Sequence, residues 1–178
     1  MSTWQTIGVV ALSFVAMEFV AWATHKFVMH GFLWSLHKDH HQRDHDHVLE
    51  RNDSFFLLFA LPSMFLFLIG SIRGLDTPWL WIGLGILLYG IAYFLVHEVF
   101  IHQRIKWLRK SQKPYFIALR RAHKIHHKHL GKEEGECFGM LIVPFKYYRD
   151  AWITRVNFNR DDATAQRLRN DGGELRSQ

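Results

Sequence analysis

Three long apolar segments in the first hundred residues limit the folds that this chain can adopt. They cover residues 4–30, 55–72 and 79–101. At ~1.5 Å per residue, each forms a helix of about 27 Å or more, close to the ~30 Å hydrocarbon thickness of a bilayer. The first segment lacks the basic flank of a cleavable signal peptide, so we expect it to be retained as a span. The sequence therefore predicts an all-α integral membrane protein with three to four transmembrane helices.

Basic residues orient these spans. The chain has 22 Lys and Arg residues, and Arg73 is the only one in the short turn between the second and third segments. Lys and Arg concentrate on the cytoplasmic side of membrane proteins. We therefore predict a multi-pass protein with its N-terminus outside, and with its histidines and C-terminus on the cytoplasmic side.

The chain beyond the third span divides into three parts. Residues 103–135 are basic and show a helical pattern over 115–129, so we expect a cytoplasmic helical cap. Residues 137–153 begin with an apolar run too short for an ordinary span, which predicts a re-entrant or interfacial segment, with a complete fourth span as the alternative. Residues 157–178 are polar and predict a solvated tail. We therefore expect a single membrane domain over 1–156, followed by this tail.

One pattern of histidines occurs twice in the same order. Each copy has a pair five residues apart at the end of a predicted span, followed by a trio with spacing i, i+3 and i+4. The first copy comprises His25, His30, His37, His40 and His41, and the second comprises His97, His102, His123, His126 and His127. Each trio places three imidazoles on one helical face. Residues five apart are separated by about 140° around an α-helix, so we expect a loosened final turn, a π-bulge or convergence from two sides at each pair.

Ten imidazoles in two ordered copies predict a site for two metal ions. Two octahedral ions would leave about two positions for oxygen, water or substrate, and open positions are typical of catalytic sites. The single cysteine, Cys137, excludes an internal disulfide, a four-cysteine zinc site and a cysteine-ligated iron–sulfur cluster. Imidazole suits iron, zinc, copper and nickel, so the ligands alone do not select the metal. His45, His47 and His129 lie outside the repeat and receive no role, because isolated histidine-rich stretches are often solvated surface.

Three acidic residues are candidates for orienting the histidines. Asp39 and Glu98 adjoin predicted ligands, and carboxylates commonly accept hydrogen bonds from metal-bound imidazoles. Glu18 lies seven residues before His25, on nearly the same helix face and about 10 Å deeper in the membrane. An intramembrane carboxyl group usually serves function, although a structural hydrogen bond to a neighbouring helix explains Glu18 equally well. We interpret Asp53, before the second span, as a helix cap.

The predicted position of the metal site selects a class of reaction. A site at the inner membrane boundary can receive an apolar molecule from the lipid and electrons from the cytosol. A redox-active metal pair there could reduce dioxygen and insert one oxygen atom into a C–H bond. The sequence has no nucleotide-binding glycine motif, so we expect a separate electron donor. The basic segments would attract a small acidic carrier such as a ferredoxin, and no nucleic-acid partner is expected.

These motifs resemble those of the bacterial β-carotene hydroxylases, within the wider fatty acid hydroxylase and sterol desaturase superfamily. The resemblance rests on the two histidine copies, on Asn52-Asp53 and on the segment from Gly131 to Pro144, and it extends over about residues 17–148. It implies a non-haem di-iron monooxygenase of the bacterial inner membrane, in which the ten histidines hold two iron ions and O2 is a cosubstrate. Zinc or another divalent metal suits the same ligands. The implied reaction hydroxylates C3 and C3′ of β-ionone rings, converting β-carotene through β-cryptoxanthin to zeaxanthin.

The residues that would bind the ring, and the substrate itself, are less constrained. Aromatic residues near the level of the histidines are candidates, although helix packing also explains each of them: Trp22, Phe27, Tyr89, Tyr93 and Phe94. A hydroxylase or desaturase of fatty acyl or sterol lipids would use the same metals. A metal transporter or sensor is a third possibility, but transport needs polar ligands through the membrane depth. Only Glu18 and the helix-end histidines interrupt the spans in that way.

Overall fold

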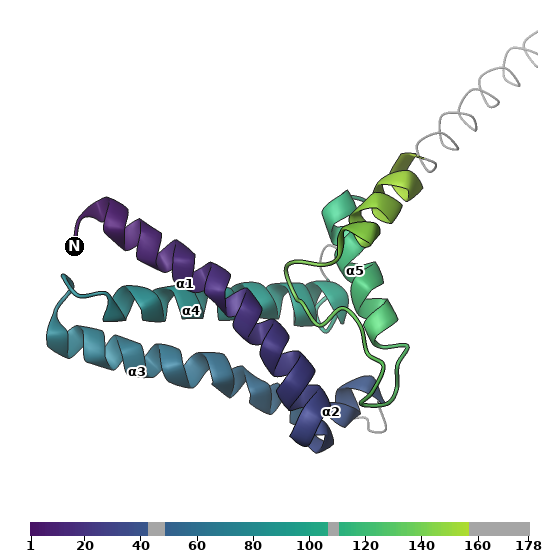
Figure 1. Cartoon of the computed structure of the whole chain (residues 1–178), viewed down its shortest axis with the longest axis horizontal. Helices are drawn as coiled ribbons and strands as arrows, with labels where there is room; N and C mark the ends of the chain where they lie inside the picture. The colour runs from purple at the N-terminus through teal and green to yellow at the C-terminus, as the bar shows by residue number, and fades with distance from the viewer. Residues whose placement is uncertain (43–48, 107–110, 157–178) are drawn as a thin grey trace, which may run out of the picture.

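The computed structural model describes residues 1–42, 49–106 and 111–156, and every regular element in these ranges is a helix. Three helices form the bundle seen in Figure 1, and each is long and apolar enough to cross a membrane: Thr3–Phe32, Arg51–Arg73 and Trp79–Ile101. Large apolar side chains point outward from this bundle, and Leu12, Phe19 and Phe65 are 71%, 67% and 62% exposed. Such a surface suits contact with lipid. The predicted all-helical fold is confirmed, while His45, His47 and the tail at 157–178 lie outside the described residues.

The histidine pairs lie on or next to π-helices that continue an α-helical span, with His102 as the C-cap residue of the second π-helix. The first span passes from α1 (Thr3–Ala23) into η1 (Thr24–Phe32), and the third passes from α4 (Trp79–Phe94) into η3 (Leu95–Ile101). The turns close with i→i+5 bonds, such as the bond from the His102 N–H to the His97 carbonyl at 2.9 Å. In this wider turn, residues five apart return to nearly the same face. The predicted loosening at both pairs is therefore confirmed.

The second span begins earlier than predicted. Its start is a 3-10 helix, η2 (Arg51–Phe56), which continues as α3 (Leu57–Arg73). Glu50 is the N-cap residue, and its backbone N–H donates to Asp53 Oδ2 at 3.0 Å in a capping box. Asp53 is therefore a capping residue, as interpreted. It acts from the third position inside the helix, because Glu50 occupies the N-cap position.

Small residues allow the three spans to pack closely. A Cβ atom at Gly85 of α4 would lie 2.6 Å from Ser13 Cβ and 2.7 Å from the Val10 carbonyl oxygen of α1. On the other side of α4, Ser63 Oγ of α3 donates to the Gly83 carbonyl at 2.9 Å. Small and hydroxyl side chains are typical of helix interfaces in membranes, where close backbone approach replaces the hydrophobic effect. α4 consequently packs between α1 and α3.

The shorter helices gather at one end of the bundle. α2 (Trp34–His41) follows the first span after a kink at Gly31, and α5 (Pro114–His126) begins with proline at its first position. Both lie at the end opposite the N-terminus (Figure 1). Residues 137–144 are not helical, and residues 145–156 form a helix packed on α5. The apolar run that begins at Cys137 therefore does not form a continuous helix.

Candidate metal centre

The structure gathers nine of the ten predicted histidines into two groups. The five-histidine group contains His25, His30, His37, His41 and His126, and the four-histidine group contains His40, His97, His102 and His123. Within each group the candidate ligand atoms all lie within 4.8 Å of one another, and every member except His102 is fully buried. His127 lies between the groups, with its ring centroid 4.5 Å from those of both His41 and His123. The whole predicted set therefore converges in one place.

Each group takes histidines from both copies of the repeat. His126 of the second copy lies with the first-copy histidines, and its Nε2 atom is 3.2 Å from Nε2 of His30. His40 of the first copy lies with the second-copy histidines, and its Nε2 atom is 3.2 Å from Nε2 of His97. His40 and His126 are the middle members of their trios, so the two copies exchange equivalent residues. The same relation makes His127 the counterpart of His41.

Neutral oxygen atoms orient the five-histidine group. Four of its imidazoles donate from Nδ1 to backbone carbonyls within residues 129–138: His25 to Phe138 at 3.1 Å, His30 to Lys132 at 3.1 Å, His41 to His129 at 3.0 Å and His126 to Glu136 at 2.8 Å. The fifth, His37, donates from Nδ1 to Asn52 Oδ1 at 2.6 Å. A carbonyl oxygen can only accept, so each bond places the proton on Nδ1 and leaves the Nε2 lone pair facing inward.

Carboxylates orient two members of the four-histidine group instead. His40 Nδ1 donates to Glu50 at 2.7 Å, and His97 Nδ1 donates to Glu98 Oε1 in a short bond. Arg104 joins the two acids, because its guanidinium lies 3.2 Å from Glu50 and 2.7 Å from Glu98. The two groups therefore differ in charge although their histidines are related by the repeat.

The inward Nε2 atoms fit a metal ion placed between them. Five pairs of these atoms lie close together: three in the five-histidine group and one in the four-histidine group at 3.2 Å, and His102 with His123 in the four-histidine group at 2.8 Å. With metal–nitrogen bonds of about 2.1 Å, adjacent ligands are ~3.0 Å apart in octahedral and ~3.4 Å apart in tetrahedral geometry. Lone pairs that face each other at this distance would repel without a cation. Among the described residues, His127 Nε2 is also buried without a hydrogen-bond partner.

Burial keeps the imidazoles in the neutral form that binds metals. Desolvation lowers the pKa of His37 to about 2 and that of His41 to about 4. The same cause, with repulsion from neighbouring imidazoles, lowers the pKa of His126 to about 2 and that of His127 to about 3. The centre therefore offers neutral nitrogen donors at neutral pH.

The three predicted orienting acids have different positions. Glu98 bonds a histidine, as predicted. Asp39 Oδ2 accepts from the Arg51 N–H at 2.7 Å, at the start of η2. Glu18 accepts from the Tyr89 hydroxyl of α4 at 2.7 Å and from backbone N–H groups near Met140. Glu18 therefore forms the structural bond to a neighbouring helix that was the second interpretation of this residue.

Several orienting groups were missed by the sequence analysis. Glu50 and Arg104 have no spacing that links them to the histidines, and backbone carbonyls exist at every residue. Asn52 was noted only through the family motif. Gln103, which lies between His102 and Arg104, has a positive φ of 56°. Non-glycine residues rarely adopt this backbone conformation, and only coordinates reveal it.

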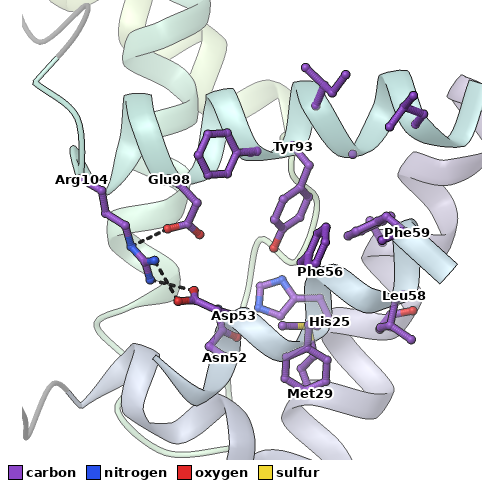
Figure 2. A pocket seen from close by; sticks show the side chains of 18 of the residues that line it. His25, Met29, Asn52, Asp53, Phe56, Leu58, Phe59, Tyr93, Glu98 and Arg104 are labelled. Carbon is purple, nitrogen blue, oxygen red and sulfur yellow. Dashed lines mark hydrogen bonds and ion pairs between the residues drawn. The ribbon is translucent and has the colours of Figure 1, made fainter. Parts of the chain in front are cut away.

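An apolar cavity of about 490 Å³ leads to the centre. Its walls come mainly from η1, η2, α3 and α4, and include Met29, Phe59 and Tyr93 (Figure 2). His25 lies at one side of the cavity, and Figure 2 shows the Arg104 ion pairs at its polar end. Of the aromatic candidates, Tyr93 and Phe94 line the cavity. Tyr89 instead bonds Glu18, and Trp22 packs edge-to-face with Phe27.

Most of this chain aligns with known proteins of similar sequence. Residues 10–146 match a family model described as fatty acid hydroxylase. The chain is 36% identical over 137 residues to a protein named beta-carotene hydroxylase from Paracoccus sp. (strain PC1), covering 76% of this chain and 83% of that protein. A beta-carotene hydroxylase from Pantoea ananas is 37% identical over 141 residues, covering 79% and 78%. Beta-carotene 3-hydroxylase 2, chloroplastic, from Arabidopsis thaliana is 32% identical over 148 residues, covering 80% of this chain and 48% of that protein. No solved structure gives a significant match.

Proposed function

This chain belongs to the fatty acid hydroxylase family, together with the bacterial β-carotene hydroxylases, and from that premise we propose that it is an O2-dependent carotenoid 3-hydroxylase. The reaction hydroxylates C3 and C3′ of β-ionone rings and converts β-carotene through β-cryptoxanthin to zeaxanthin. The observation that carries the proposal is the apolar cavity that reaches His25 of the five-histidine group and Glu98, which accepts from His97 of the four-histidine group.

The two groups would hold a pair of iron ions, one in each group. His127 completes the four-histidine group, because it is the counterpart of His41 and its Nε2 atom is buried without a partner. All ten predicted histidines then serve as ligands, and zinc or another divalent metal would suit the same nitrogen atoms. When bound, the metal pair supplies the redox chemistry by which O2, two electrons and two protons give one hydroxylated carbon and one water.

The protein contributes orientation of the substrate and exclusion of water. Away from its polar end the cavity lining is apolar, which matches a hydrocarbon ring and holds water away from the reacting carbon. Two residues of the lining, Phe56 of the second span and Ile91 of the third, are 64% and 47% exposed. The cavity therefore reaches the lipid-facing side between the second and third spans. A ring could enter from the bilayer while the rest of the carotenoid stays in lipid.

The topology gives the electron donor access from the cytosol. We place the N-terminus outside and the metal centre, the cap at 103–135 and the C-terminus in the cytoplasm, because Lys and Arg concentrate at the histidine end of the chain. In a bacterium this is the inner membrane. A ferredoxin-type protein would dock on the basic surface that includes Arg121 and Lys124 of α5 and supply electrons to the metal centre. Residues 1–156 form the membrane domain, and 137–153 combine a re-entrant loop with an interfacial helix.

The test is product analysis in cells that accumulate β-carotene. Expression of the chain is expected to convert β-carotene to β-cryptoxanthin and zeaxanthin, and the His40→Ala variant, expressed to the same level, is expected to yield neither. Chromatography of the pigments measures the conversion. An expressed, metal-loaded protein that leaves β-carotene unchanged would overturn the proposal. Hydroxylated fatty acyl or sterol lipids in the same extracts would then point to the alternative substrate class.

A further inference from the structure

One loop supplies most of the groups that orient the five-histidine group. Residues 129–138 lie between α5 and the helix at 145–156, and four of their carbonyl oxygens each accept from a different imidazole of the group. Three of these imidazoles belong to the first histidine copy, far away in sequence. The position of this loop therefore decides where the Nε2 lone pairs of the five-histidine group point.

Glu18 holds residues 140–142, which follow this loop. Glu18 Oε1 accepts from the backbone N–H groups of Met140, Leu141 and Ile142 at 3.0, 3.0 and 2.9 Å. Its Oε2 accepts from the Leu141 N–H at 3.1 Å and from the Tyr89 hydroxyl at 2.7 Å. Glu18 lies in the first candidate membrane span, where a carboxyl group without partners is strongly unfavourable. These donors satisfy it, and they in turn attach the loop to α1 and α4.

The backbone between Glu18 and the histidines transmits this attachment. Cys137 has a φ of +63° and separates the Glu136 and Phe138 carbonyls, which bond His126 and His25. A non-glycine residue adopts this conformation only where surrounding contacts impose it. Next to it, a Cβ atom at Gly139 would overlap the Ile142 carbonyl oxygen and lie 3.3 Å from Glu18 Oε1. The segment between the ligands and the anchor is therefore tight and has little freedom to shift.

We propose that Glu18 is a positioning residue for the five-histidine group, which acts by anchoring the loop whose carbonyls orient the imidazoles. The inference rests on the proposed function, because it assumes that both groups bind metal. Among the described residues, the hydrogen bonds of Glu18 go to Tyr89 and to residues 140–142, and none joins it to Glu50, Glu98 or Arg104 beside the four-histidine group. Loss of Glu18 should therefore weaken the binding of the ion in the five-histidine group and leave the binding of the other ion unchanged.

The test compares metal binding by purified full-length variants in detergent. Glu18→Leu removes every side-chain hydrogen bond to the backbone of residues 140–142 and introduces an apolar side chain of similar size. Glu18→Gln keeps a carbonyl oxygen for the three N–H groups and can donate its amide to the Tyr89 oxygen. With iron(II) added anaerobically, Glu18→Leu is expected to bind one of the two ions about 10-fold or more weakly, the loss typical of disturbed orienting partners. Glu18→Gln is expected to bind both ions nearly as wild type does.

Double variants identify the ion that is lost. In a His25→Ala background, Glu18→Leu is expected to cause no further loss of metal, because both changes act on the five-histidine group. In a His102→Ala background, Glu18→Leu is expected to remove most of the remaining ion. The Mössbauer spectrum of iron-loaded Glu18→Leu should correspondingly lose the component that His25→Ala loses. Tyr89→Phe is the matched control, since it removes one bond to Glu18 and leaves all bonds to the loop.

The outcomes separate this inference from the proposed function. Wild-type protein that binds fewer than two ions would overturn both. Two ions in the wild type and two equally tight ions in Glu18→Leu would overturn the role of Glu18 alone. Equal weakening of both ions would also overturn it, because the effect would then be general instability. If Glu18→Leu does not fold, Gly139→Ala provides the second variant: it displaces the same loop from the same anchor and is expected to weaken the same ion.

Discussion

Replacing Arg104 with methionine tests whether one guanidinium balances the acids beside the four-histidine group. Arg104 makes a bidentate pair with Asp53 at 2.9 and 3.0 Å and also contacts Glu50 and Glu98 at 3.2 and 2.7 Å. The side chains of these acids are 10–26% exposed, and that of Arg104 is 25% exposed. Methionine retains much of the volume but leaves three neighbouring carboxylates without their counter-charge.

The expected loss of stability follows from this burial. Removing one partner of a buried ion pair costs about 3–5 kcal/mol, and we take ~3 kcal/mol because water reaches part of the cluster. For a chain of this length, ~1 kcal/mol corresponds to about 2–4 °C in Tm, so Arg104→Met is expected to lower Tm by about 6–12 °C. Burial also raises the pKa of Glu50, and the Arg104 charge opposes that shift. Without Arg104, Glu50 is protonated more readily and becomes a poorer acceptor for His40.

Thermal unfolding of the metal-free protein in detergent, followed by circular dichroism, measures the effect. Arg149→Met is the control, because the Arg149–Asp150 pair is 3.5 Å apart and exposed, and surface changes of this kind stay within about 0.5 kcal/mol. Arg104→Lys, which keeps the charge but not the bidentate geometry, is expected to lie between Arg104→Met and wild type. Equal Tm values for wild type and Arg104→Met would refute the reasoning, as would equal shifts in Arg104→Met and Arg149→Met.

Three further changes test other parts of the structure. His126→Ala is expected to abolish hydroxylation and to remove about one of two ions, because His126 belongs to the five-histidine group; metal analysis showing two retained ions would contradict its role as a ligand. Gly85→Ala is expected to lower Tm, because its Cβ would lie 2.6 Å from Ser13 Cβ, whereas Gly8→Ala has open space and should not; equal Tm values would exclude the close packing of α1 and α4. Acidification of metal-free protein is expected to lower its stability between about pH 6.5 and 4, since the unfolded chain takes up a proton near pH 6.5 and folded His41 only near 4. Protonation of His41 alone is expected to cost about 3 kcal/mol of folding stability as the pH falls from 6.5 to 4. A Tm that stays constant between these pH values would count against the burial of the imidazoles.

The helices and the histidine set were predictable because their signals are local. Hydropathy identified the three spans to within a few residues, except where Glu50 and Asp53 extend the second span toward its N-terminus. The i, i+5 spacing at His25 and His97 predicted a loosened turn, and both residues lie on π-helices. These features depend on residues within one or two turns of each other, so a linear pattern contains them.

The sequence by itself predicted three apolar helices long enough to span a membrane and ten repeated histidines that could hold metal ions. Only the tertiary structure decided that His40 and His126 exchange groups, that carbonyls of residues 129–138 orient one group, and that Glu50, Glu98 and Arg104 surround the other. The physical reason is that orientation depends on which backbone and side-chain atoms meet across the fold. Every residue carries a carbonyl oxygen, and packing alone selects the four that face an imidazole.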